Sequence, residues 1–199
     1  MFLSLAVVSL LDKISFIPDV LHCHDYHTSM ITDIIKASED ETIRKIKTLY
    51  TIHNLNYQGK SGVRSLSTGN LNKKSLEVLS KDAQDGDINF MVQGILNADL
   101  VNTVSKTYAK EITTSAYGAH LDNIIKKRTK DLYGVLNGID VHLFDPEKDR
   151  FIKHKFSLKT IKNKDKNKAL LQKELGLPQR RDIPLIGLVS RLVWQKGLD

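Results

Sequence analysis

The sequence predicts an α/β protein built on a parallel sheet with crossover helices. Strand-like segments that end in polar residues recur along the chain, and helix-like segments lie between them, which is the alternation typical of parallel sheets. The composition agrees: the chain has 199 residues, of which 41% are hydrophobic and 27% charged. Such a chain is an ordinary globular one, long enough for one domain or for parts of two.

The chain opens with an apolar segment, residues 1–11, that is too short for a membrane span, which needs about 20 residues. No basic residue precedes it and no small-residue cleavage site follows it, so a signal peptide is not indicated. Its apolar side chains recur at helical spacing. We therefore expect a helix whose buried face carries Leu3, Val7, Leu10, Leu11 and Ile14.

Five segments are predicted as strands because apolar and β-branched residues are bounded by polar ones: 19–25 (DVLHCHD), 47–54 (KTLYTIHN), 99–105 (DLVNTVS), 133–140 (YGVLNGID) and 184–191 (PLIGLVSR). Helical patterns between them are marked by Ile88, Met91 and Ile95, by Tyr108 with Ile112, by Leu121 with Ile124 and Ile125, and by residues 169–175 closed by Gly176 and Pro178. The polar stretch 59–87, with glycines at 59, 62, 69 and 86, predicts a long loop outside the core, beside a site.

The net charge of +7 comes from the last quarter of the chain. Residues 1–144 carry 16 basic and 16 acidic side chains, whereas residues 145–199 carry 14 and 7. Most of the excess is a lysine run that consists of Lys153, Lys155, Lys159, Lys162, Lys164, Lys166, Lys168 and Lys173. Because Phe156 is the one aromatic residue among them, we interpret the run as a solvated linker and helix face rather than a nucleic-acid-binding surface.

The densest group of potential metal ligands is His22, His24, Asp25 and His27, and imidazoles at these spacings can bind zinc. This group leaves a metal-dependent hydrolase open as an alternative function. The pattern His-x-His-x-Asp-His of the metallo-β-lactamases would need an acid at position 26, where Tyr26 stands. Histidines that are hydrogen-bonded at a strand end are the simpler interpretation.

Three further motifs put ligand-binding groups at the ends of predicted strands, where open parallel sheets bind their ligands. Residues 51–59 (TIHNLNYQG) and 136–140 (LNGID) offer imidazole and amide groups that suit a polyhydroxylated ligand. Arg191 and Lys196, five residues apart, could clamp a diphosphate. No serine or cysteine nucleophile lies in an elbow nearby, and no P-loop or Gly-x-Gly-x-x-Gly pattern is present.

Taken in order, these motifs resemble one family, the bacterial glycogen synthases and plant starch synthases. The matching stretches are PDVLHCHDYHT, TIHNLNYQG, NF followed by GILNADLVNTVSKTYAKEI, AYG, GVLNGID with Phe144 and Pro146 after it, and SRLVWQKGLD. The resemblance implies a GT-B glycosyltransferase with two facing Rossmann-like domains. It implies retaining transfer of glucose from a nucleotide sugar, typically ADP-glucose, to the non-reducing end of an α-1,4-glucan.

The resemblance also implies residue roles. His53 and Asp25 are the expected catalytic residues, and Arg191 and Lys196 are expected to meet the donor phosphates. The expected substrate-binding residues are Asn54, Tyr57, Gln58, Asn137 and Gly138. Neither a metal nor a cofactor is implied, because the nucleotide sugar is a substrate. The expected partners are this donor and the glucan acceptor, glycogen or starch, with no nucleic acid and no membrane.

Three positions depart from the family's pattern: Tyr26 stands where Trp is usual, Lys106 where Pro is usual, and Val92 where Lys is common. The family's N-terminal Lys-x-Gly-Gly-Leu loop and most of its second domain have no counterpart in the sequence. We therefore expect a fragment that is inactive by itself, and a non-catalytic glucan-binding module is the remaining alternative.

The expected domains are the later part of the N-terminal Rossmann-like domain (1–144), a basic interdomain connection with a helix (145–182), and the first strand and loop of the C-terminal domain (183–199). The single cysteine, Cys23, permits no internal disulfide and fits a reducing compartment, so we expect the protein in the cytoplasm.

Overall fold

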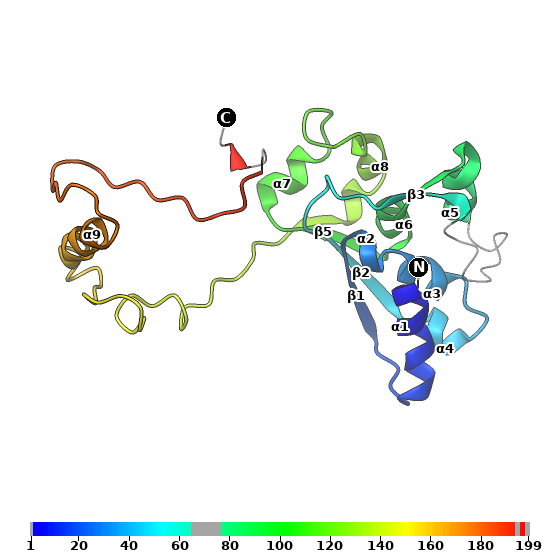
Figure 1. Cartoon of the computed structure of the whole chain (residues 1–199). Coiled ribbons are helices and arrows are strands. Elements are labelled where there is room, and N and C mark those ends of the chain that lie inside the picture. Colours follow the sequence, from blue (N-terminus) through cyan, green and yellow to red (C-terminus); the bar gives the residue numbers. More distant parts are fainter. Residues whose placement is uncertain (1, 65–76, 194–195, 198–199) are drawn as a thin grey trace. The chain divides into compact units, whose positions relative to one another are not determined.

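A computed structural model describes residues 2–64, 77–193 and 196–197 of the chain (Figure 1). The chain divides into two compact units, residues 1–137 and residues 138–199. None of the described helices is both long enough and apolar enough to cross a membrane.

The first unit contains a parallel sheet of four strands in the order β1-β2-β5-β6. The strands are β1 (Val20–His24), β2 (Lys47–Ile52), β5 (Leu100–Thr103) and β6 (Leu132–Gly134) (Figure 1). Four of the five predicted strands are thereby confirmed, although the fourth ends at Gly134 instead of Asp140. Parallel neighbours need crossover connections, and these supply the helices.

The helices of the first unit are short: α1 (Phe2–Lys13), α2 (Asp25–Thr28), α3 (Met30–Lys36), α4 (Glu41–Arg44), α6 (Phe90–Asn97), α7 (Lys106–Glu111), α8 (Asp122–Lys126) and the 3₁₀ turn η4 (Thr129–Asp131). Local sequence explains where several begin. The side chains of Asp40, Asn89 and Ser105 accept hydrogen bonds from backbone N–H groups in the first turns of α4, α6 and α7. Such caps satisfy donors that the helix itself leaves unpaired.

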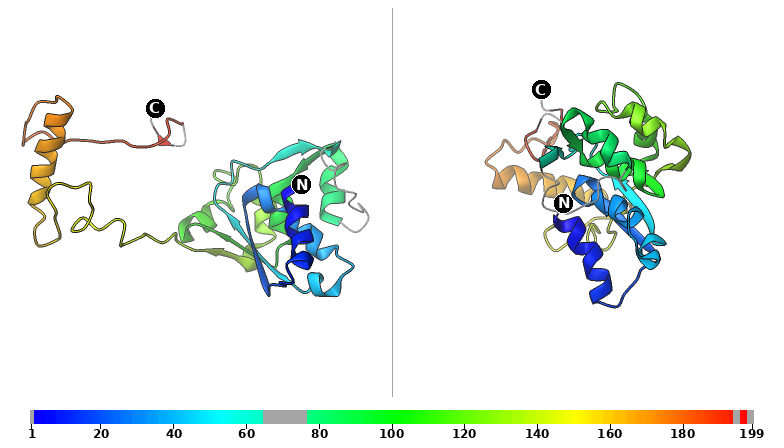
Figure 2. Two further views of the ribbon diagram at one scale, coloured as in Figure 1. Left: turned by 60° about the horizontal axis from the view of Figure 1, so that its bottom comes forward. Right: turned by 90° about the vertical axis from the view of Figure 1, so that its right-hand side faces the viewer.

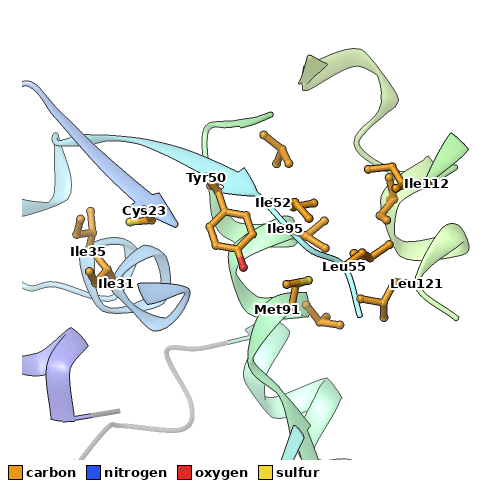
Figure 3. Close-up of a cluster of buried hydrophobic side chains, with 14 of the residues drawn as sticks. Cys23, Ile31, Ile35, Tyr50, Ile52, Leu55, Met91, Ile95, Ile112 and Leu121 are labelled. Carbon is orange, nitrogen blue, oxygen red and sulfur yellow. The ribbon is translucent and has the colours of Figure 1, made fainter. Parts of the chain in front are cut away.

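The hydrophobic core lies against one face of this sheet (Figure 3). Side chains alternate between the two faces of a strand, so Cys23, Tyr50, Ile52 and Val101 point to the same side. All four are buried, and α3 and α6 supply the buried side chains packed with them: Ile31, Ile35, Met91, Val92 and Ile95. Val92, one of the departures from the family's pattern, is therefore a core residue. Figure 2 shows the sheet and its helices from two further directions.

The end of α6 is fixed by the guanidinium group of Arg128. It donates hydrogen bonds to four backbone carbonyl oxygens, those of Ile95, Leu96, Ala98 and Asp99, over 2.7 to 3.2 Å. The carbonyl groups of Ile95 and Leu96 lie in the last turn of α6, and those of Ala98 and Asp99 follow the helix. Carbonyl groups at a helix end have no partner within the helix and would otherwise need water. One side chain thus ties α6 to the segment that leads from α8 to β6.

The first helix is confirmed, but its predicted buried face is only partly right. Leu11 is buried and Val7 is partly buried against the core, whereas Leu3, Leu10 and Ile14 are 51%, 50% and 51% exposed. The face toward the core carries Ser4 in place of Leu3, together with Val7, Val8 and Leu11. The helix has apolar residues on more than one side, so its periodicity alone does not identify the side that packs.

The polar stretch 59–87 is more structured than a loop. It contains β3 (Lys60–Gly62), α5 (Glu77–Asp82) and the 3₁₀ turn η3 (Ala83–Asp85), and β3 pairs antiparallel with β4 (Asp87–Asn89). Leu79 and Ile88 are buried with Met30 in a second, smaller core. The prediction that this stretch lies outside the core is therefore wrong for its described C-terminal part. Gly69 lies outside the described residues.

The second unit contains one described helix, α9 (Asn163–Glu174), which ends just before Gly176, as predicted. The amide of Gln172 donates to the carbonyl oxygen of Pro178, and the ammonium group of Lys168 donates to those of Arg181 and Ile183. Most of the lysine run is exposed, as a solvated linker and helix face requires.

The fifth predicted strand, residues 184–191, is wrong: these residues form no strand in the structure. A strand is stabilised by hydrogen bonds to a neighbouring strand. The described part of the second unit offers no such neighbour, so an apolar, β-branched sequence is not sufficient here.

A buried carboxyl group lies between α3 and α6. Asp33 accepts a hydrogen bond from the side-chain amide of Asn97 over 2.6 Å, and its second oxygen is buried without a partner among the described residues. Burial, with a smaller contribution from the charge of Asp82, raises the pKa of Asp33 to about 8. The folded protein therefore keeps a proton on Asp33 that the unfolded chain loses near pH 4.

This proton makes the free energy of unfolding fall as pH rises from about 4 to about 8, since the charged carboxylate is disfavoured only in the folded state. Asp33→Asn keeps the acceptor for Asn97 and cannot ionise. As the pH rises from 5 to 9, the native chain should lose stability that the variant keeps. We expect the free energy of unfolding of the variant, relative to that of the native chain, to increase by on the order of 2–4 kcal/mol over this range. Urea unfolding at both pH values measures it.

Asp40→Asn is the control, because hydrogen bonds from Thr42 lower the pKa of Asp40 and keep it charged at both pH values. Its effect on stability should be the same at pH 5 and pH 9. A pH-independent effect of Asp33→Asn would contradict the assignment of a protonated Asp33.

Candidate active site

Two predicted catalytic residues meet at the carboxyl ends of β1 and β2. The parallel register places His24 opposite Thr51, so Asp25 and His53, which follow within two residues, reach the same edge of the sheet. One carboxylate oxygen of Asp25 accepts hydrogen bonds from the backbone N–H groups of His53, over 2.8 Å, and of Asn54, over 3.4 Å. Asp25 itself has a φ of 52°, which is unusual for a residue with a Cβ. The carboxylate thus fixes the backbone on which His53 stands.

Three imidazole rings lie together at this edge. Nδ1 of His24 is 2.9 Å from Nε2 of His53, and Nε2 of His22 is 2.6 Å from the hydroxyl oxygen of Thr51. The ring centroids of His22 and His24 are 4.0 Å apart. Burial lowers the pKa of His22, as does repulsion from the other two imidazoles when they are charged. A neutral His22 is therefore favoured beside the other two rings.

The loop after His53 is closed by its own side chains. The side-chain oxygen of Asn54 accepts a hydrogen bond from the backbone N–H of Asn56 over 3.1 Å, which is an Asx turn. Leu55 is buried in the core and its backbone N–H donates to the hydroxyl group of Tyr108. The loop is consequently anchored at both its polar and its apolar residues.

An open pocket of about 520 Å³ follows this loop. Its side chains include Tyr26, Tyr57, Lys60 and His120, and Tyr57 is 49% exposed. Gly59 forms part of the wall with a φ of +65°, and a Cβ atom there would lie 2.3 Å from the ring of Tyr26. Only glycine leaves room for that ring.

Gln58 connects the pocket to two distant segments. Its side-chain amide nitrogen donates to the backbone carbonyl oxygen of Ala119 over 2.8 Å, and its side-chain oxygen accepts from the amide of Asn89 over 2.6 Å. The residue is 9% exposed. Ala119 and His120 both have positive φ angles, 46° and 66°, and Gln58 holds this left-handed turn against the pocket. Both the nitrogen and the oxygen of the Gln58 side chain are thus hydrogen-bonded to other residues of the protein.

The family model of the starch synthase catalytic domain matches residues 1–127. The chain belongs to this family. Across the whole chain it is 44% identical to the glycogen synthase of Streptococcus uberis and 46% identical to that of Thermosipho melanesiensis. It spans about two fifths of these relatives, 42% and 41% of their lengths.

A solved structure agrees with this assignment. The catalytic domain of starch synthase IV from Arabidopsis thaliana, bound to ADP and acarbose, superposes with a TM-score of 0.86 and is 31% identical in sequence. The match covers 98% of this chain and 40% of the plant one. The expected GT-B type of α/β fold is thereby confirmed.

The other residues implied by the starch synthase resemblance belong to the end of the first unit or to the second unit. Asn137 is exposed at the end of the first unit, and Gly138, Arg191 and Lys196 belong to the second unit, where they are also exposed. The side chains of Arg191 and Lys196 make no hydrogen bond or ion pair with any residue that the structure describes. Trp194 and Gln195, between them, lie outside the described residues. The roles expected for the four exposed residues, Asn137, Gly138, Arg191 and Lys196, stay predictions.

The metal-dependent hydrolase receives no support. Within residues 2–64, 77–193 and 196–197, no three His, Cys, Asp or Glu side chains are arranged to hold a metal ion. His22, His24 and Asp25 instead bond to Thr51, to His53 and to the backbone. Hydrogen-bonded histidines at a strand end, the simpler interpretation, are confirmed.

The sequence motifs do not identify the pocket residues Tyr26, Lys60 and His120, nor the contact between His24 and His53. The contact had a signal, because the spacing His-x-His puts both side chains of β1 on one face of the sheet. His120 had none: it is a single polar residue that reaches the pocket through contacts distant in sequence.

The substitution Gln58→Glu tests the link across the pocket. The introduced side chain would still accept from Asn89, but a carboxylate oxygen would face the carbonyl oxygen of Ala119, where the amide now donates. We expect a loss of about 3 kcal/mol in the free energy of unfolding at pH 8, and a smaller loss at pH 5, where a protonated carboxyl can donate. Urea unfolding at both pH values measures it.

Asn56→Asp is the matched control, since it makes the same amide-to-acid change on the exposed side of the same pocket. We expect its effect to stay within about 0.5 kcal/mol. Equal losses for the two variants would show that the hydrogen bond to Ala119 is unimportant.

Proposed function

We propose that the full-length protein containing this chain transfers glucose from a nucleotide sugar, ADP-glucose, to the non-reducing end of an α-1,4-glucan, with retention of configuration. The observation that carries the proposal is the group at the ends of β1 and β2, where Asp25 fixes the backbone of His53 by a hydrogen bond of 2.8 Å. Membership of the starch synthase family supports it, as do the ADP and acarbose bound to the plant neighbour.

In this proposal the chain's residues orient and hold the substrates, and none of them supplies a nucleophile. The bond between the anomeric carbon and the diphosphate breaks, the acceptor 4-hydroxyl forms the new bond, and its proton leaves with the diphosphate product. His53 contacts the transferred glucose, and Asp25 fixes the backbone that carries His53. Arg191 and Lys196 neutralise the charge that develops on the diphosphate, which is the role of preorganised cations. No metal and no cofactor takes part.

We place the glucan acceptor in the pocket beyond Tyr57. Sugar rings present apolar faces and polar edges, and this pocket offers the rings of Tyr57 and Tyr26 with Lys60 and His120 beside them. It is open, as a site for a polymer end must be. Tyr57, exposed and with no hydrogen bond from its hydroxyl group to a described residue, is the aromatic group free to contact the sugar.

The substrates are those of intracellular polysaccharide synthesis, so we propose that the protein acts in the cytoplasm. A nucleic-acid role for the lysine run is not needed in this account. A glucan-binding module without turnover is the outcome that would replace the proposal.

The test uses the protein at its full encoded length, with radiolabelled ADP-glucose and glycogen. Incorporation of glucose is expected, and His53→Ala should lower kcat about 100-fold or more, because the group that contacts the transferred sugar is removed. Glycogen binding without incorporation, from ADP-glucose or any other nucleotide sugar, would contradict the proposal and indicate a binding module.

Tyr57→Ala tests the acceptor pocket in the same assay. We expect KM for glycogen to rise about 10-fold and KM for ADP-glucose to stay the same, because stacking on one aromatic ring is lost only for the acceptor. Tyr133→Ala is the control, since Tyr133 is similarly exposed, at 54%, but does not line this pocket. Equal effects of the two substitutions would place the acceptor elsewhere.

A further inference from the structure

The polar face of the sheet carries hydrogen bonds and one ring contact that together lead to His53. The register pairs His24 with Thr51 and Thr51 with Asn102, so these side chains lie on the face opposite the core, together with His22. Thr51 is buried, and its hydroxyl oxygen is 2.5 Å from the side-chain oxygen of Asn102 and 2.6 Å from Nε2 of His22.

The donors and acceptors of these hydrogen bonds determine the protonation of His22. The side-chain oxygen of Asn102 can only accept, so the hydroxyl group of Thr51 donates to it. That hydroxyl has no second proton and must accept from Nε2–H of His22. Nε2 of His22 therefore carries a proton, and the ring is held against Thr51.

The ring of His22 in turn lies against the ring of His24, with 4.0 Å between centroids. His24 is further restrained at its backbone, because its N–H donates to the hydroxyl oxygen of Thr28 over 2.6 Å and its carbonyl oxygen accepts from that hydroxyl over 2.9 Å. Nδ1 of His24 then faces Nε2 of His53 at 2.9 Å. The position of His24 is thus set before any substrate binds.

We propose that His24 is a positioning residue: it occupies Nε2 of His53 and leaves Nδ1 as the ring nitrogen that His53 presents to the sugar. This inference rests on the proposed function for its catalytic consequence, but the hydrogen bond itself does not. Whichever ring donates, one proton lies between the two nitrogens, and Nδ1 of His53 has no partner among the described residues. Asp25 bonds to the backbone of His53, so it does not orient the ring.

The contact predicts a spectroscopic signature in the chain itself. Long-range ¹H–¹⁵N correlation spectra distinguish a protonated ring nitrogen from a bare one, and the signals of His53 are assigned by their loss in His53→Gln. We expect one dominant tautomer of His53 in the native chain and averaged ring nitrogens in His24→Ala. His22→Gln, which keeps a donor for Thr51, should leave the His53 signals in the native pattern. The same His53 pattern in the native chain and in His24→Ala would overturn the proposal.

Kinetics of the full-length protein test the consequence. His24→Ala should lower kcat about 10- to 100-fold with little change in KM for ADP-glucose, because a misoriented catalytic group affects the reaction more than binding. His24→Asn places an amide where Nδ1 lies and should restore most of kcat. A loss of kcat that His24→Asn does not restore would overturn the proposal.

The two measurements separate this inference from the proposed function. If the protein incorporates no glucose but the His53 signals still depend on His24, the transferase proposal fails and the positioning contact stands. If glucose is incorporated and His24→Ala changes neither kcat nor the His53 signals, the positioning contact fails alone.

Discussion

The parallel register of β1 against β2 is the constraint on which the site depends. It sets His24 opposite Thr51, and because of this pairing Asp25 and His53 lie together at one edge of the sheet. A shift by one residue would move every side chain of β1 to the other face. Cys23, buried against the helices, would then exchange places with the histidines, so core packing and site geometry are specified by the same pairing.

The two faces of the sheet are stabilised by different interactions. On the core face, burial of apolar side chains such as Ile52 and Ile95 supplies the driving force, at about 25 cal/mol per Å² of apolar surface. On the other face, the buried hydroxyl group of Thr51 would cost about 1–3 kcal/mol if it were unpaired. His22 and Asn102 satisfy it, and this polar pairing also brings the imidazole rings together.

The sequence pattern predicted those features that depend on residues close together in the chain. The four strands of the sheet follow from alternation and β-branched residues, and the polar strand ends marked His53 and Asp25 as neighbours of a site. The role of Gln58 could not be predicted, because its partners Asn89 and Ala119 lie 31 and 61 residues away. The buried face of α1 depended on the neighbours it packs against, and residues 184–191 needed a strand to pair with. Each failure concerns a partner distant in sequence.

Some cationic side chains of the second unit are in ion pairs and others are not, and this difference bears on how a nucleotide sugar would bind. Arg180, Arg181 and Lys148 are in ion pairs with Asp182, Asp165 and Asp145. Arg191 and Lys196 have no such partner in the described part of the chain. A carboxylate already bound to a guanidinium group competes with a phosphate for the same donors. Arg191 and Lys196 are exposed and make no ion pair with any described residue. Their N–H groups therefore stay available for a diphosphate, as the proposed transfer requires.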